Sequence, residues 1–94
     1  MGTDRPEQTG DSGEAGFRSL LLKLGTAGLI HLGAAPDPGS GKTTVDLAQA
    51  KQVIDLLDLL RVKTAGNLTA GESRMLDDLL FDLRMRYLDA EKRA

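Results

Sequence analysis

The residues most suggestive of chemistry are Gly41, Lys42 and Thr43, because a glycine followed by a lysine and a hydroxyl residue ends the loop that binds nucleotide phosphates. That motif needs another glycine five residues before Gly41, where this chain has Pro36. The loop must also follow a buried β-strand and lead into a helix at the lysine. The residues upstream have a helical pattern instead. Nucleotide binding here is therefore a minor alternative, and we expect a flexible connection in which Thr43 or Thr44 caps the next helix.

Other candidates for chemistry are few. His31 is the only histidine, and it lies on the apolar face of a predicted helix without an acidic neighbour in sequence. A histidine at the edge of the core explains it better than a catalytic dyad. Metal sites in helical bundles use Glu-x-x-His pairs, which this chain lacks. Asp77, Asp78 and Asp82 lie beside arginines on a face typical of solvent exposure. We expect no catalytic residue, no metal and no cofactor, and hence no enzyme.

Composition narrows the class of protein further. The chain has 94 residues, enough for one domain, and a net charge of -2, which gives no basic excess for binding nucleic acid. It has no cysteine, which excludes disulfides and fits a reducing compartment. We therefore expect a cytoplasmic protein without a nucleic-acid partner.

The end of one long helix is signalled by Lys63 and Gly66. The apolar pattern of a helix over about 45–65 stops where Gly66 appears, and glycine tolerates the left-handed backbone that ends helices. Lys63 falls in the last turn, where a cation favours the helix dipole.

The next helix begins directly afterwards. Thr69 and Glu72 have the spacing of a capping box, in which each side chain accepts a hydrogen bond from the other residue's amide. This start signal predicts a helix over about 70–92, folded back on its predecessor as an antiparallel αα-hairpin. Asn67 has no capping role. We expect its side chain to close the turn, and the alternative is that a partner binds it.

One more helix is predicted before this hairpin, over about 17–33. It is apolar nearly all round, which indicates burial from more than one direction. Gly25, Ala27 and Gly28 form a flat strip on it, so the helix is either central to the fold or the seam of a dimer. Its apolar run is shorter than the ~20 residues of a spanning helix, and it lacks a broad cationic face. Peripheral membrane association through this helix is the alternative function, although we do not expect membrane contact.

The predicted fold is thus all-α: a small helical bundle made of the hairpin and the apolar helix. Residues 1–16 are rich in polar residues and glycine, and are expected to be a disordered tail. Residues 17–94 form one helical domain, with a Pro- and Gly-rich linker at 34–44.

A resemblance to a known family extends over residues 17–88. The residues that carry it are Leu32-Gly33 leading into Pro36-Asp37-Pro38, Val45-Asp46-Leu47 with Ala50-Lys51, Ile54-Asp55-Leu56-Leu57, Lys63-Thr64-x-Gly66-Asn67-Leu68-Thr69 with Glu72, and Leu79-Leu80, Leu83-Arg84 and Tyr87. On these residues the chain resembles the bacterial domain-of-unknown-function family numbered 1844. It departs from the family at Ala70-Gly71, where Pro-Glu is usual. The resemblance implies a small α-helical bacterial protein and no particular activity.

Some apolar residues fall outside the main faces of their helices. They are Leu22, Leu29 and Ile30 in the first helix, and Phe81, Met85 and Leu88 in the last. The second group is covered either by the first helix or by a partner. About seventy ordered residues give a core of marginal stability, and the chain has no disulfide to support it. We therefore expect a homo-oligomer, a dimer or larger, that acts by binding protein. An unknown protein is a second candidate partner.

Charged residues on the last helix have the spacing of surface ion pairs. The predicted i,i+4 pairs there are Arg74 with Asp78, Asp82 with Arg86, and Asp89 with Arg93, and Lys51 with Asp55 has the same spacing on the helix before it. Such pairs mark the solvent side of each helix.

Overall fold

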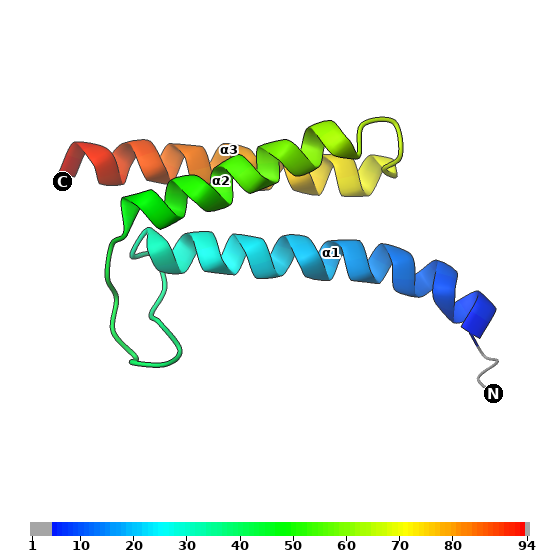
Figure 1. Cartoon of the computed structure of the whole chain (residues 1–94), viewed down its shortest axis with the longest axis horizontal. Coiled ribbons are helices and arrows are strands. Elements are labelled where there is room, and N and C mark those ends of the chain that lie inside the picture. Colours follow the sequence, from blue (N-terminus) through cyan, green and yellow to red (C-terminus); the bar gives the residue numbers. More distant parts are fainter. Residues whose placement is uncertain (1–4, 94) are drawn as a thin grey trace.

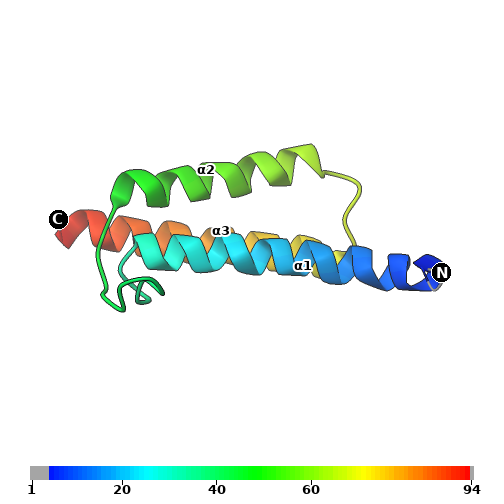
Figure 2. The same ribbon diagram turned by 60° about the horizontal axis from the view of Figure 1, so that its bottom comes forward.

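The structure, a computed structural model, describes residues 5–93, and residues 5–14 by their backbone alone. Three helices follow one another: α1 (Arg5–His31), α2 (Leu47–Lys63) and α3 (Ala70–Arg93). Successive helices run antiparallel, and each contacts the other two (Figure 1). Figure 2 shows the α2–α3 turn at one end of the bundle and the α1–α2 connection at the other. The predicted all-α bundle is confirmed.

The start of α1 differs from the prediction. The helix begins at Arg5 instead of about residue 17, and it ends at His31 instead of about residue 33. It therefore takes in residues 5–16 of the stretch expected to be a disordered tail, whereas residues 1–4 lie outside the described residues. The tail is accordingly not confirmed.

The cap of α2 was predicted wrongly. Asp46, in an extended conformation with φ -132° and ψ 90°, is the N-cap, and its side chain accepts a hydrogen bond from the Gln49 amide at 3.1 Å. Thr43 and Thr44 lie too far before the helix to cap it, because Val45 and Asp46 first pair with the end of α1. Leu32 and Val45 form an isolated antiparallel bridge, and the Asp46 amide donates to the His31 carbonyl at 2.7 Å. This pairing delays the start of α2 to Leu47.

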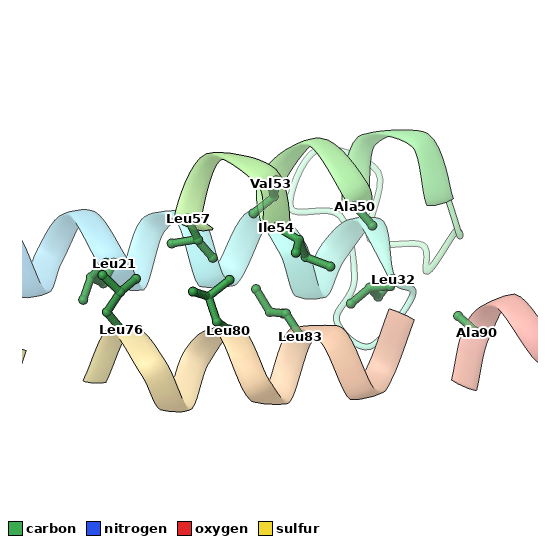
Figure 3. Close-up of a cluster of buried hydrophobic side chains, with 10 residues drawn as sticks. All are labelled: Leu21, Leu32, Ala50, Val53, Ile54, Leu57, Leu76, Leu80, Leu83 and Ala90. Carbon is green, nitrogen blue, oxygen red and sulfur yellow. The ribbon is translucent and has the colours of Figure 1, made fainter. Parts of the chain in front are cut away.

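The core is aliphatic and lies where the three helices meet (Figure 3). Its buried residues are Leu21, Leu32, Ala50, Val53, Ile54, Leu57, Leu76, Leu80, Leu83 and Ala90. On α2 and α3 they recur at three-, four- and seven-residue spacings, which places them on one face of each helix, whereas α1 contributes Leu21 and Leu32 directly follows its end. Full burial of a leucine side chain contributes roughly 1.5–3 kcal/mol, so these few residues carry most of the fold's stability.

The glycines of α1 allow a close approach of α3. A Cβ at Gly25 would lie 2.8 Å from Cδ1 of Leu79, and one at Gly28 would lie 3.0 Å from Cδ1 of Leu83 and 3.4 Å from Cγ1 of Val53. The flat strip predicted on this helix is therefore covered inside the chain, by α3 and α2. Of the two roles that the sequence allowed, the helix is central to the fold.

The turn between α2 and α3 has the chemistry expected of it. Lys63 lies in the last turn of α2, and Thr64 is the C-cap, with its hydroxyl donating to the Leu60 carbonyl at 2.7 Å. Gly66 has φ +83° and is left-handed, as predicted. The Asn67 amide donates to the Thr64 carbonyl at 2.9 Å, which closes a four-residue turn with Gly66 in its third position. The Asn67 side chain adds a long contact of 3.5 Å to the Ala65 carbonyl.

The capping box of α3 is formed. The Thr69 amide donates to Oε1 of Glu72 at 2.8 Å, and the Glu72 amide donates to Oγ1 of Thr69 at 3.1 Å. Glu72 is 7 % exposed, so its carboxylate is held against the bundle end. Lys63, Gly66, Asn67, Thr69 and Glu72 therefore all have positions that build the turn.

Candidate functional site

The outer face of α3 carries three large apolar side chains that are left open to solvent. Phe81 is 68 % exposed, Met85 52 % and Leu88 50 %. Their i, i+4, i+7 spacing places them on one face of the helix, which we call the α3 stripe. α1 packs against a different side of α3, where Leu79 and Leu83 lie over its glycines. The sequence left two possibilities for the cover of the α3 stripe, namely α1 or a partner. Because α1 packs on another side of α3, it does not cover the stripe.

A charged residue lies on the same line at each end of the α3 stripe. Asp78 comes three residues before Phe81 and Lys92 four residues after Leu88, and both are exposed. Within residues 15–93, whose side chains the structure describes, neither Asp78 nor Lys92 takes part in an ion pair. The pair predicted between Arg74 and Asp78 is accordingly not formed.

The other predicted surface pairs do form. They are Lys51–Asp55 at 3.0 Å, Arg86–Asp82 at 3.0 Å and Arg93–Asp89 at 2.9 Å. Asp58 also joins α2 to α3, because its Oδ1 accepts from Arg61 at 3.0 Å and pairs with Arg84 at 3.2 Å. The hydrogen bond from Arg61, aided by Arg84, lowers the pKa of Asp58 below its ordinary value of 3.8 against the opposing effect of desolvation.

The predicted interface residues of α1 lie apart from the α3 stripe. Leu22 is 61 % exposed, whereas Leu29 and Ile30 are half-buried, and Leu29 packs against the core. Leu22 and Leu29 line an open groove of about 570 Å³ between α1 and α3, with Met75 and Leu79 on its other side. The six residues proposed from sequence thus occupy more than one surface.

Charged residues also line this groove, and they come from both helices. Arg18 lines it from α1, and Arg74, Asp78 and Asp82 line it from α3. Both signs of charge occur, so the lining does not select an anion or a cation.

A further apolar patch lies between α1 and α2, and sequence reasoning did not assign it to an interface. Leu20 is 42 % exposed, Leu56 47 % and Leu59 51 %, and they line a shallow hollow with Leu24 and Leu60. An apolar residue off the buried face of its helix was the signal that could have indicated it, because the spacing of Leu59 from Ala50 and Ile54 places it on the opposite side of α2.

The loop that resembles a phosphate-binding loop uses its amides internally. The Asp37 amide donates to the Lys42 carbonyl at 2.8 Å, and the Gly41 amide to the Asp37 carbonyl at 2.7 Å. The Gly39 amide donates to Oδ1 of Asp37 at 2.7 Å, and the Lys42 amide to Oγ of Ser40 at 3.3 Å. α2 begins at Leu47, five residues beyond the lysine, so this helix does not start at the lysine as a phosphate-binding loop requires.

His31 and the acidic residues of α3 do not form a cluster with metal-ligand geometry. In the part of the chain that the structure describes, no three His, Asp or Glu side chains gather as ion ligands would. His31 is half-buried at the C-terminal end of α1, where its carbonyl accepts from the Asp46 amide. Among the described helices, none combines the length and apolarity needed to cross a bilayer.

The fold and its surface define a small all-α protein, a three-helix bundle with apolar faces left uncovered. The chain belongs to the family described as Domain of unknown function (DUF1844), whose sequence model matches residues 14–89. The resemblance carried by the Lys63–Thr69 string is thereby confirmed. Neither the comparison with curated proteins nor that with solved structures gave a match.

Proposed function

We propose that this protein is a non-catalytic, self-associating module of the cytoplasm that works by binding protein through the α3 stripe. The observation that supports the proposal is the exposure of Phe81, Met85 and Leu88 on a helix whose other side already completes the core. These side chains gain little from folding of the single chain, since half or more of each remains in water. Contiguous exposed apolar residues with polar neighbours mark interaction surfaces.

The energetics favour a protein partner for this surface. Each apolar side chain gains roughly 25 cal/mol for every Å² removed from water, and aromatic and methionine side chains are enriched where proteins meet. The ion pairs Arg86–Asp82 and Arg93–Asp89 lie beside the α3 stripe and give it a polar edge. An apolar centre with such an edge is the usual anatomy of an interface.

Light scattering coupled to gel filtration tests the proposal. The wild-type chain is expected to elute as an oligomer, and the variant carrying Phe81→Gln, Met85→Gln and Leu88→Gln as a folded monomer. Val62→Gln is the matched control, because Val62 is 66 % exposed but lies on α2, outside the α3 stripe. An oligomer that survives the triple substitution, or a wild-type chain that is monomeric and instead floats with lipid vesicles, would overturn the proposal.

A further inference from the structure

We infer that the partner of the α3 stripe is the α3 stripe of a second copy, packed antiparallel about a two-fold axis at Met85, so that Asp78 of each copy faces Lys92 of the partner subunit. This inference rests on the proposed function and specifies its partner and orientation.

The spacing along α3 supports a helix–helix seam. Asp78, Phe81, Met85, Leu88 and Lys92 follow one another at intervals of three, four, three and four residues. That alternation has a mean repeat of 3.5, which keeps a straight line of side chains facing one partner helix in a left-handed pair. The residues on this line are exposed, so a second helix can reach all of them.

The line is nearly symmetric about its centre. Asp78 and Lys92 lie seven residues on either side of Met85, and Phe81 and Leu88 lie four and three residues from it. At 1.5 Å per residue, inverting one copy onto another sets Phe81 within about 1.5 Å, along the axis, of Leu88 of the partner subunit. A two-fold interface requires such a self-complementary patch.

The charges at the two ends select the direction. An antiparallel pair places Asp78 opposite Lys92 of the partner subunit at both ends of the seam. A parallel pair places Asp78 against the partner's Asp78 and Lys92 against the partner's Lys92, where like charges repel. Neither residue has an ion-pair partner within residues 15–93, so both charges are available to a second copy.

The rest of the bundle leaves the side chains of this seam exposed, and Asp78 also lines the edge of the groove between α1 and α3. α1 lies on the side of α3 marked by Leu79 and Leu83, and α2 on the side marked by the ion pair of Arg84 with Asp58. The exposure of Phe81, Met85 and Leu88 shows that neither helix covers the line. Antiparallel pairing also sets the two α3 dipoles in the favourable opposite sense.

Cysteine cross-linking tests the orientation, because the chain has no cysteine of its own. The D78C and K92C variants, mixed and mildly oxidised, are expected to form a mixed disulfide. Neither variant alone is expected to cross-link, because equivalent positions of an antiparallel pair lie 14 residues apart along the axis, or about 21 Å, whereas a disulfide spans less than about 7 Å between Cα atoms.

The outcomes separate the inference from the proposed function. Self-cross-linking of either variant alone would show parallel pairing and overturn the inference while leaving self-association intact. An oligomer by mass without the mixed disulfide would overturn this orientation, and the triple substitution in the α3 stripe then decides the proposed function: loss of the oligomer keeps it, and survival of the oligomer overturns it. A monomeric wild-type chain would overturn both.

A charge exchange gives a second readout that needs no cross-link. D78K and K92D are each expected to raise the dissociation constant about tenfold, because each sets like charges together at both ends. The double variant D78K/K92D is expected to return to within about twofold of the wild type. The antiparallel seam would be contradicted if neither single variant changed the dissociation constant. It would also be contradicted if the double variant had a higher dissociation constant than either single variant.

Discussion

A Cβ at Gly28 would lie 3.0 Å from Cδ1 of Leu83, on the side of α1 that faces α3. Leu83 is fully buried, and Val53 of α2 lies 3.4 Å from the same point, so the space at Gly28 is closed from two directions. The absence of a side chain at this position therefore sets how closely the three helices approach one another.

Gly28→Ala is expected to destabilise the fold by about 1–2 kcal/mol. Overpacking against Leu83 and Val53 costs roughly 1–3 kcal/mol, and the better helix propensity of alanine returns up to about 1 kcal/mol. Gly25→Ala is the matched control. Its Cβ would meet Leu79 at 2.8 Å, but Leu79 is half-buried beside the open groove and can move aside. Urea unfolding should show Gly25→Ala as neutral or stabilising, and equal losses for both variants would contradict this account.

Gly66→Val is expected to cost more than Thr69→Ala. Gly66 has φ +83° and open space around it, so the cost of a side chain there is that of a left-handed backbone, about 1–2 kcal/mol or more for a β-branched residue. Loss of the Thr69 cap costs about 1 kcal/mol. Thermal unfolding measures which of the two variants loses more stability. Gly66→Asn controls for the loss of glycine, because asparagine tolerates this conformation. A Gly66→Asn variant as unstable as Gly66→Val would point to another cause.

The capping box is expected to behave as a coupled pair. Thr69→Ala and Glu72→Ala each remove one acceptor, at 3.1 Å and 2.8 Å respectively, and each should cost about 1 kcal/mol of unfolding free energy. The double variant should cost less than the sum, because either single change already loosens the first turn of α3. A double-mutant cycle by chemical denaturation checks this, and strictly additive losses would mean that the two hydrogen bonds form independently.

How far the sequence predicts this molecule depends on how local the signal is. Gly66, Thr69 and Glu72 were assigned correctly because their conformations and bonds are set by neighbours a few residues away. The N-cap of α2 was missed because the hydrogen bond from the Asp46 amide to the His31 carbonyl decides where the helix starts. Nothing in the sequence near Thr43 reveals that contact.

The same difference between local and long-range signals applies to the α3 stripe. The spacing of Phe81, Met85 and Leu88 showed that they share a face, but not whether α1 would cover it. That outcome depends on Gly25 and Gly28 receiving Leu79 and Leu83, which turns the α3 stripe away from α1. Periodicity alone cannot choose between two sides of a helix that both carry apolar residues.

Acid should weaken the contact between α2 and α3 made by Asp58. The pKa of Asp58 is lowered in the folded state, first by the hydrogen bond from Arg61 and also by Arg84. Its contribution to folding stability is therefore present above the unfolded pKa of 3.8 and is lost as the pH falls through the folded pKa. The stability difference between wild type and Asp58→Asn should therefore shrink as the pH is lowered below 3.8. Urea titrations across this range measure it, with Asp77→Asn as the control for loss of an exposed charge. A difference that stays constant down to the lowest pH would contradict the assignment.

The central claim is that the chain self-associates, which the pairing of one α3 stripe with another requires. Sedimentation equilibrium of the unmodified protein over a wide range of concentrations tests this most directly, because it needs neither a label nor a substitution. The account predicts a weight-average mass that rises with concentration from the 10.0 kDa of a single chain towards twice that value. A mass that stays at 10.0 kDa at every concentration would contradict it.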